Sequence, residues 1–135
     1  MKGSYVLLIK ITNDQNIKIG KLGRIFFKKG FYAYVGSAMN SLDARIARHL
    51  RPEKKLHWHI DYLLKNAEIN KIFYKETNEK IECYIANKFS GKLENIQGFG
   101  CSDCKCTSHL FYGKQKEIEK IGKELSLNIK NIQNP

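Results

Sequence analysis

The sequence predicts a single α+β domain, and three observations support this prediction. The chain has 135 residues, enough for one core that buries about two-thirds of the unfolded surface. Its first third contains short apolar runs separated by glycine and polar turns, which is typical of strands. Further along, apolar residues recur every four positions, which is typical of helices that bury one side. We therefore expect one domain across residues 1–135.

Strands are expected in both halves of the chain. Residues 4–11 are rich in Val, Leu and Ile, and residues 31–35 are rich in aromatic side chains. Two short runs on either side of a turn at residues 20–23 predict an extra N-terminal hairpin. The remaining strands are expected over 69–74 and 108–112, the latter after a Gly/Ser-rich loop at 96–103.

Four amphipathic segments predict helices. The first covers residues 42–51, with Ser41 or Asn40 as its N-cap and Asp43 in its first turn. Its apolar stripe, expected to be buried, is Leu42, Ile46 and Leu50. The other three helices are expected over 57–64, 79–89 and 117–127.

The composition limits the class of protein and its location. Apolar residues make up 42%, charged residues 27%, and there are 2 Pro, which excludes disordered, collagen-like and membrane-spanning classes. The apolar run at residues 6–9 is too short for a signal peptide or a membrane span, so we expect a cytoplasmic protein without a membrane partner. In the cytoplasm, the 4 Cys are expected as thiols or metal ligands rather than disulfides.

The charge distribution is the first indication of function. Lys and Arg number 24 against 13 Asp and Glu, a net charge of +11. Residues 1–60 hold 12 basic and 3 acidic side chains, whereas residues 61–135 hold 12 and 10. This asymmetry favours a polyanionic partner, either nucleic acid or an anionic membrane face. A lysine-rich protein with no charged partner is the alternative.

The polar side of the first helix is a candidate anion site. Arg45 and His49 are four residues apart and therefore neighbours on a helix, with Arg48 adjacent. Gly36, at the end of the preceding strand, allows a ligand to approach the backbone. The amides that lead into the helix can also meet an anion. An ordinary solvated helix face explains the same residues equally well.

One carboxylate stands out in the third predicted helix. Glu82 lies one position away from the buried stripe, and the small Ala86 follows one turn later. This arrangement leaves space for a hydrated cation such as Mg²⁺, which keeps several waters and few protein ligands. An exposed boundary glutamate is the more common explanation of such a residue.

An ordered set of motifs resembles the GIY-YIG nuclease superfamily. The set comprises Gly3-Ser4-Tyr5, Tyr34-Val35-Gly36-Ser37-Ala38, the Leu42–His49 segment with its Arg45, and Glu82. The resemblance covers a core at residues 3–90. A tail at residues 98–111, with the pattern GFG-x-S-D-C-x-C-x-S-H-L-F, is similar to one uncharacterised branch sometimes fused to an endonuclease III-type repair enzyme. Residues 91–135 would then be a branch-specific extension.

The resemblance implies the fold, the reaction and the site. The implied fold is a small central antiparallel sheet flanked by helices, with the two tyrosine motifs on neighbouring strands. The implied activity is that of a Mg²⁺- or Mn²⁺-dependent DNA endonuclease in repair or recombination, and an endonuclease III-type partner follows by analogy. The implied catalytic residues are Tyr5, Tyr34, Arg45, His49 and Glu82, with Glu82 as the metal ligand. The predicted substrate-binding residues combine residues of the tyrosine motif with residues of the first helix and of a histidine cluster discussed below. They are Gly36, Ser37, Arg48, His57 and His59.

Two departures from the family pattern matter. The hairpin at residues 17–28 lengthens the gap between the tyrosines. The asparagine that many family nucleases carry after the glutamate has no clear counterpart, because Asn87 is too close and Asn95 is a weak match. An alternative function is therefore a nucleic-acid-binding module of the same fold with little or no turnover.

The chemistry of phosphodiester hydrolysis supports this set of residues. The uncatalysed reaction is very slow, so the site must activate a nucleophile and neutralise charge. Tyr5, assisted by Tyr34, would take a proton from water, provided that cations stabilise the phenolate. Arg45 would offset charge in the transition state. The alternative for both tyrosines is a purely structural role, as half-buried aromatic residues of strands.

The cluster His57-Trp58-His59 allows two interpretations. His57 and Asp61 are four apart and could pair on the second helix, with His59 pointing elsewhere and Trp58 in the core. Contact with a substrate is one interpretation. Structural hydrogen bonding is favoured, because buried histidines usually have a partner.

The tail also allows two interpretations. The residues that could close a tetrahedral Zn²⁺ site are Cys101, Cys104, Cys106 and His109. Zinc sites usually take ligands from two separate segments, so the favoured interpretation is a Gly-rich loop whose polar side chains cap backbone groups or line the cleft. A small zinc-binding interaction protein is a third functional hypothesis.

Overall fold

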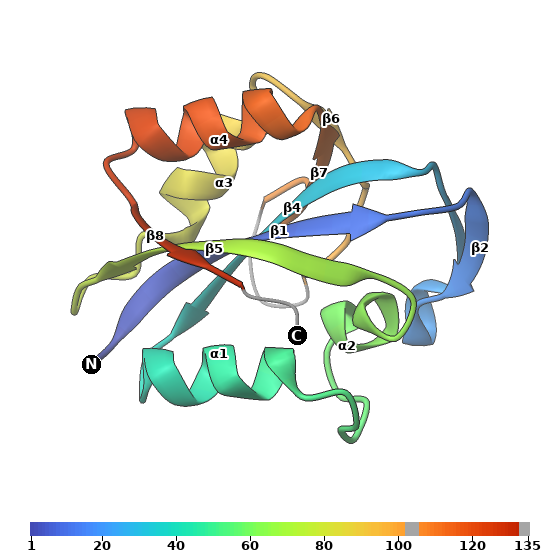
Figure 1. Ribbon diagram of the computed structural model, residues 1–135, viewed down its shortest axis with the longest axis horizontal. Helices are drawn as coiled ribbons and strands as arrows, with labels where there is room; N and C mark the ends of the chain where they lie inside the picture. Colours follow the sequence, from blue (N-terminus) through green and yellow to red (C-terminus); the bar gives the residue numbers. More distant parts are fainter. Residues whose placement is uncertain (102–105, 133–135) are drawn as a thin grey trace.

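A six-stranded antiparallel sheet forms the centre of the computed structural model, which describes residues 1–101 and 106–132 (Figure 1). All neighbouring strands of this sheet run antiparallel, as expected for an α+β fold. In spatial order the strands are β6 (Glu94–Asn95), β7 (Leu110–Gly113), β4 (Gly30–Ala38), β1 (Gly3–Ile11), β5 (Glu68–Glu76) and β8 (Asn128–Asn131). The four helices are α1 (Leu42–Leu50), α2 (His59–Leu64), α3 (Glu82–Ser90) and α4 (Gln115–Glu124).

The central strand β1 is buried on both faces, which explains its almost continuous apolar sequence. Val6 and Leu8 pack into the core beneath α3 and α4. Leu7 and Ile9 pack into the opposite core, which α1 and α2 cover. Figure 1 shows the two helix pairs on opposite sides of the sheet. The alternation along β1 therefore builds two cores that share one strand.

The predicted extra hairpin is confirmed. It consists of β2 (Gln15–Lys18) and β3 (Arg24–Phe27), joined through a short 3₁₀ turn at Gly20–Leu22. Ile17 and Phe27 of this hairpin are buried in the core on the α1 and α2 side. The hairpin thus closes one end of that core.

Helix α1 begins where the sequence predicts, but its buried side differs from the predicted one. The Ser41 hydroxyl accepts a hydrogen bond from the Ala44 amide at 3.1 Å and caps the helix. Leu42 and Ile46 are buried as expected, whereas Leu50 is 38% exposed. His49, predicted on the polar side, is buried instead, at 3% exposure. The reason is that the sheet offers His49 a hydrogen-bonding partner, described below.

Several boundaries differ from those predicted. Helix α2 begins at His59 and not at residue 57, because the Asp61 carboxylate binds the backbone amides that precede the helix. Helix α3 begins at Glu82 and not at residue 79, which places that carboxylate in the first turn. The sequence also missed the edge strand β8, whose four residues are all exposed and carry no alternation signal.

The C-terminal third is part of the central sheet. Strand β7 pairs with β4, β6 pairs with β7, and β8 pairs with β5, so this third adds strands at both edges. Beyond Tyr34, the Val35 amide donates to the His109 carbonyl at 2.9 Å, so the contact with β4 continues into the segment that leads into β7. Gly36 and Ser37 at the end of β4, together with His109, line the polar cleft described below. Within the described ranges, no helix has the length and apolar character needed to cross a membrane.

Candidate active site

A polar cleft of about 230 Å³ gathers residues from widely separated segments. It is lined by residues of β1, β4, α1 and α3, by the segment 57–59 at the start of α2, and by Gly100 and His109. Most of the residues predicted from the sequence contribute to it. These are Tyr5, Tyr34, Gly36, Ser37, Arg45, His57, His59 and Glu82. Of the predicted catalytic and substrate-binding residues, His49 and Arg48 do not line the cleft but contact Tyr5 and Trp58, which do.

The two tyrosines face the same side of the sheet. In the antiparallel register Tyr5 of β1 lies opposite Gly36 of β4, and Tyr34 lies opposite Leu7. Their ring centroids are 6.5 Å apart. A Cβ at Gly36 would lie 2.5 Å from the Tyr5 hydroxyl oxygen. Gly36 is therefore needed because the Tyr5 ring lies across it, which is a different role from the predicted one of admitting a ligand to the backbone.

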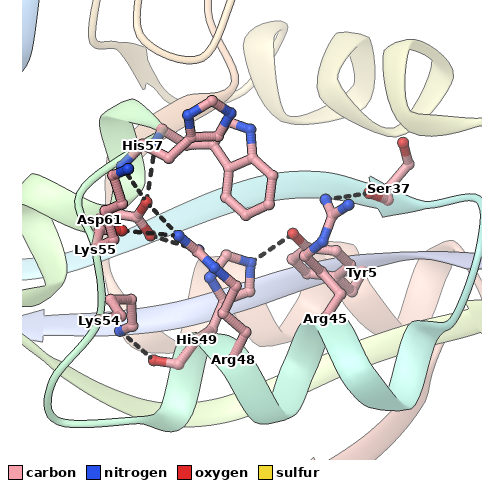
Figure 2. A network of polar contacts seen from close by, with 10 residues as sticks. Tyr5, Ser37, Arg45, Arg48, His49, Lys54, Lys55, His57 and Asp61 are labelled. Atoms are coloured by element: carbon pink, nitrogen blue, oxygen red, sulfur yellow. Dashed lines mark hydrogen bonds and ion pairs between the residues drawn. The ribbon is translucent and has the colours of Figure 1, made fainter.

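The Tyr5 hydroxyl is hydrogen-bonded to His49. Its oxygen lies 2.6 Å from Nε2 of the imidazole, and both side chains are buried (Figure 2). Burial raises the pKa of Tyr5 well above its ordinary value, and the nearby Arg45 guanidinium only partly opposes this. Burial also lowers the pKa of His49 to about 4, helped by the positive charges of Arg45, Lys54 and Arg48 and opposed by Asp61. At neutral pH the pair is thus a neutral phenol and a neutral imidazole.

His49 has one nitrogen that finds no hydrogen-bond partner. Its Nδ1 is buried and unpaired among the residues that the structure describes. If Nε2 accepts a hydrogen bond from the Tyr5 hydroxyl, the imidazole proton is on Nδ1. This N–H donor then has no acceptor among the described residues. An unsatisfied buried donor costs about 1–3 kcal/mol. The arrangement is therefore kept at a cost in stability, as is common at functional sites.

Arg45 bridges the tyrosine pair and the mouth of the cleft. Its Nη1 donates to the Ser37 carbonyl oxygen at 3.0 Å, as Figure 2 shows. Its guanidinium carbon lies 4.3 Å from the centroid of the Trp58 ring. These two contacts fix the orientation of the guanidinium. Because the group has five N–H donors, others remain for a ligand. Arg45 can therefore hold an anion in the cleft while it remains anchored.

Arg48 forms an internal ion pair. Its two terminal nitrogens donate to the two Asp61 carboxylate oxygens at 2.8 and 2.9 Å. The Asp61 Oδ2 also accepts from the amides of His57 and Trp58, both at 2.9 Å. Burial would raise the pKa of Asp61, but the Arg48 hydrogen bond and the two amides more than compensate and lower it. Helix α1 is thereby joined to α2 through a bidentate pair.

The predicted pairing of the His57 imidazole with Asp61 is wrong. The His57 backbone amide, and not its ring, donates to the carboxylate, because α2 begins two residues later than expected. The ring of His57 lies against Trp58 with centroids 5.2 Å apart and lines the cleft. Trp58 itself, predicted in the core, is half-buried and also lines the cleft.

The protonation of His59 follows from its contacts. Its Nδ1 accepts a hydrogen bond from the Gly100 amide at 2.9 Å. A neutral imidazole that accepts at Nδ1 must carry its proton on Nε2. Burial lowers the pKa of His59, which favours this neutral form. His59 is therefore a hydrogen-bond donor in the wall of the cleft.

Glu82 supplies the one carboxylate that lines the cleft within the described ranges. It lies in the first turn of α3, and its side chain is 31% exposed. Its Oε2 is 3.8 Å from Nδ1 of the buried His109. Mg²⁺ is commonly bound by one or two carboxylates and keeps several waters. A single, partly exposed glutamate beside tyrosine and arginine side chains fits such an ion.

Neither asparagine considered from the sequence reaches the cleft. Asn95 is held in β6, where its Oδ1 accepts from the Ser90 hydroxyl at 2.8 Å. Asn87 is exposed on α3. The cleft has no asparagine in its lining as far as residues 1–101 and 106–132 are concerned.

Two backbone amides in the first turn of α1 already have partners. The Leu42 amide donates to the Met1 carbonyl at 2.7 Å, and the Ala44 amide donates to the Ser41 hydroxyl. The residue by which α1 lines the cleft is Arg45, so the anion site predicted from this helix rests on that side chain.

The tail places His109 and Gly100 in the cleft wall, which the sequence left open. Of the four predicted zinc ligands, Cys104 lies outside the described residues. Sγ of Cys101 donates to the Phe99 carbonyl oxygen at 3.5 Å. Instead, Cys106 and His109 lie close to Cys83 of α3, a residue that the sequence analysis did not consider. The number of residues between Cys83 and the tail does not indicate this contact, because only the folding of the chain brings the two segments together.

Comparisons with known proteins identify a family but no characterised relative. No curated protein and no solved structure gives a significant match to the chain. One family model, described as a domain of unknown function, DUF123, matches residues 4–131. This match covers the four helices, all the residues that line the cleft and all but the first residue of the sheet. The chain therefore belongs to the DUF123 family.

Proposed function

We propose that this protein is a metal-dependent DNA endonuclease of the GIY-YIG type that acts in DNA repair or recombination. The observation that carries the proposal is the convergence of Tyr5, Tyr34, Arg45 and Glu82 on one cleft. These residues come from four different elements, and their types are those that hydrolysis of a phosphodiester needs.

The cleft is suited to a phosphate group. Arg45 is anchored through Ser37 and has unused N–H donors. His59, which also lines the cleft, adds a neutral donor. The excess of basic residues in the first 60 positions would attract the DNA backbone over longer distances.

The buried tyrosine–histidine pair would activate the attacking water. A resident phenolate is disfavoured, because burial raises the pKa of Tyr5. Instead, the Tyr5 oxygen would take a proton from water while its own proton passes to His49 Nε2, 2.6 Å away. The water oxygen then bonds to phosphorus in line with the leaving oxygen, the bond from phosphorus to that oxygen breaks, and the leaving oxygen takes up a proton from solvent. Tyr34 would act as a neutral hydrogen-bond donor beside this water.

Glu82 would hold the divalent cation. When bound, Mg²⁺ or Mn²⁺ supplies positive charge to the phosphate and the leaving oxygen. Arg45 offers charge to the same group from the α1 side. The metal ion and the Arg45 guanidinium would thus be held by two different elements, α3 and α1.

The second candidate is a DNA-binding module with little turnover. The absence of an asparagine from the described cleft lining favours it. Both candidates predict DNA binding that weakens steeply with salt, with a log–log slope of about −0.9 per phosphate neutralised. An endonuclease III-type repair enzyme remains a proposed partner for either of them.

Cleavage of a panel of labelled DNAs tests the proposal. The panel contains linear, nicked, flapped, branched and single-stranded DNA, each incubated with Mg²⁺ or Mn²⁺. We expect metal-dependent cleavage that Glu82→Gln abolishes and that Tyr5→Phe reduces by about 10²–10⁴-fold. The matched control is Glu79→Gln, which makes the same charge change at an exposed position three residues away and should retain full activity.

The outcomes separate the two candidates. Cleavage by the native chain and by Glu79→Gln, but not by Glu82→Gln, supports the endonuclease. Salt-sensitive binding without cleavage by any of the proteins supports the binding module. DNA binding that is weak and independent of salt would contradict both.

A further inference from the structure

A second cluster of side chains lies beside the cleft. It contains Cys83 in the first turn of α3, and Cys106 and His109 in the segment that leads into β7. The two thiol sulfurs and one imidazole nitrogen all lie within 4.8 Å of one another. The ligand atoms thus come from two segments that are far apart in the sequence, as in most structural zinc sites.

The type and spacing of these atoms match zinc. Two cysteines and a histidine form a soft-to-borderline ligand set, whereas Mg²⁺ and Ca²⁺ prefer oxygen. Zn–S and Zn–N bonds of about 2.3 and 2.0 Å place tetrahedral ligand atoms roughly 3.5–3.8 Å apart. The ligand atoms in the structure lie within 4.8 Å of one another, so their separations exceed the tetrahedral values by about 1 Å at most. Small rotations of the three side chains would therefore close the site.

The contact of Nδ1 with the backbone assigns Nε2 as the nitrogen through which His109 would bind a metal. Its Nδ1 lies 3.1 Å from the Val35 carbonyl oxygen, which can only accept a hydrogen bond. Nδ1 therefore carries the proton, and the lone pair resides on Nε2. A backbone carbonyl that binds the second ring nitrogen is the usual support for a zinc-binding histidine. The backbone of His109 is also fixed, since its amide donates to the Phe99 carbonyl at 2.8 Å.

The first turn of α3 has little other support. Its N-cap residue is Ile81, which makes no side-chain capping hydrogen bond. Such a cap is about 1 kcal/mol less favourable than Ser or Asp. A bond from Cys83 to a metal would restrain this turn and with it the neighbouring Glu82.

We propose that Cys83, Cys106 and His109 bind one Zn²⁺ ion that fastens the segment around residues 106–109 to the first turn of α3. The fourth position is left to water or another donor. The site has a structural role: it fixes the position of Glu82 and His109 in the cleft wall. It differs from the zinc site predicted from the sequence, because Cys83 replaces Cys101. The proposal does not depend on nuclease activity.

Metal content measures this site directly. We expect the protein, reconstituted with zinc and dialysed, to retain about one Zn per chain by mass spectrometry. Replacement by Co²⁺ should give the near-ultraviolet charge-transfer absorption of thiolate ligands. Cys83→Ser should lose at least nine-tenths of the zinc, while the matched Cys101→Ser should keep it.

Alkylation of the native chain provides a test that does not depend on a folded variant. Peptide mapping after iodoacetamide treatment should show Cys83 protected with zinc and modified after chelation. Equal modification of Cys83 in both states would overturn the proposal. Loss of zinc from Cys101→Ser but not from Cys83→Ser would overturn it too, in favour of a site confined to the tail. A native chain that retains no zinc after reconstitution would show that there is no such site.

Discussion

Helices α1 and α4 pack on opposite faces of the same sheet and differ in what they bury. They have 9 and 10 residues, and each buries three of them. Helix α4 buries only apolar or small residues, with Ile118 and Ile121 in the core. Helix α1 buries Leu42, Ile46 and a histidine that is hydrogen-bonded to Tyr5. The same amphipathic pattern thus produces one helix that only stabilises the fold and one that also builds the site.

This difference lowers the contribution of the α1 side of the sheet to the stability of the fold. Burying apolar side chains beneath α4 stabilises the fold by about 25 cal/mol per Å². Beneath α1, part of that gain is offset because a histidine and an aspartate are removed from water. The α1 side should therefore respond to changes in charge and pH, and the α4 side should respond to changes in volume.

The largest expected effect comes from breaking the ion pair that joins α1 to α2. Asp61→Ala removes a carboxylate that accepts from Arg48 and from two amides, so about 3–5 kcal/mol of unfolding free energy should be lost. The control is Ile118→Ala on α4, expected to cost about 2–5 kcal/mol. Urea unfolding measures both. At a temperature where both variants are folded, only Asp61→Ala should weaken DNA binding, and equal binding by the two would contradict the comparison.

The next effect is a dependence of stability on pH. Burial lowers the pKa of His49 to about 4 in the folded state, against an unfolded value near 6.5. Between these values the unfolded chain binds more protons, so stability is complete above pH 6.5 and falls as the pH drops toward 4. The expected loss is roughly 3 kcal/mol.

Urea unfolding at pH 7 and pH 4.5 measures this effect. His49→Gln keeps a polar partner for Tyr5 but cannot titrate, so most of the loss should disappear in that variant. An unchanged pH dependence in His49→Gln would assign the effect to another group.

Substitution of either of two glycines by alanine is expected to lower the free energy of unfolding by a smaller amount. A Cβ at Gly36 would meet the Tyr5 ring, and a Cβ at Gly122 of α4 would meet Phe73 at 2.8 Å. Gly36→Ala should cost about 1–3 kcal/mol and displace Tyr5 from His49. Gly122→Ala should cost less, because alanine favours the helix by about 1 kcal/mol. Thermal melts compare the two, and a larger loss for Gly122→Ala would contradict the expected order.

The smallest effect is expected at the surface pair between Lys92 and Glu124, 2.8 Å apart and about half exposed on each side. Lys92→Met should change the free energy of unfolding by no more than about 1 kcal/mol and should leave DNA cleavage unchanged. A larger loss would mean that the α4 side also relies on charge, which would weaken the contrast with α1.

The sequence by itself determined most of the elements. The apolar run of β1, the turn at residues 20–23 and the Ser41 cap each specify local structure through propensity or hydrogen bonding, and the structure confirms all three. The α+β class followed from these signals. The start of α2 did not, because Asp61 binds the amides that precede this helix, and the start of α3 did not, because its N-cap residue, Ile81, makes no side-chain capping hydrogen bond.

The tertiary structure decided which side chains meet. The burial of His49 was not predicted, because a helical pattern alone cannot show that Tyr5 offers it a partner. The contact of Cys83 with Cys106 and His109 was missed for the same reason. Spacing along the chain reports only neighbours on one element, whereas these pairs form where strands and helices cross. Most residues of the cleft could thus be named from the sequence, but their hydrogen bonds and protonation states are properties of the fold.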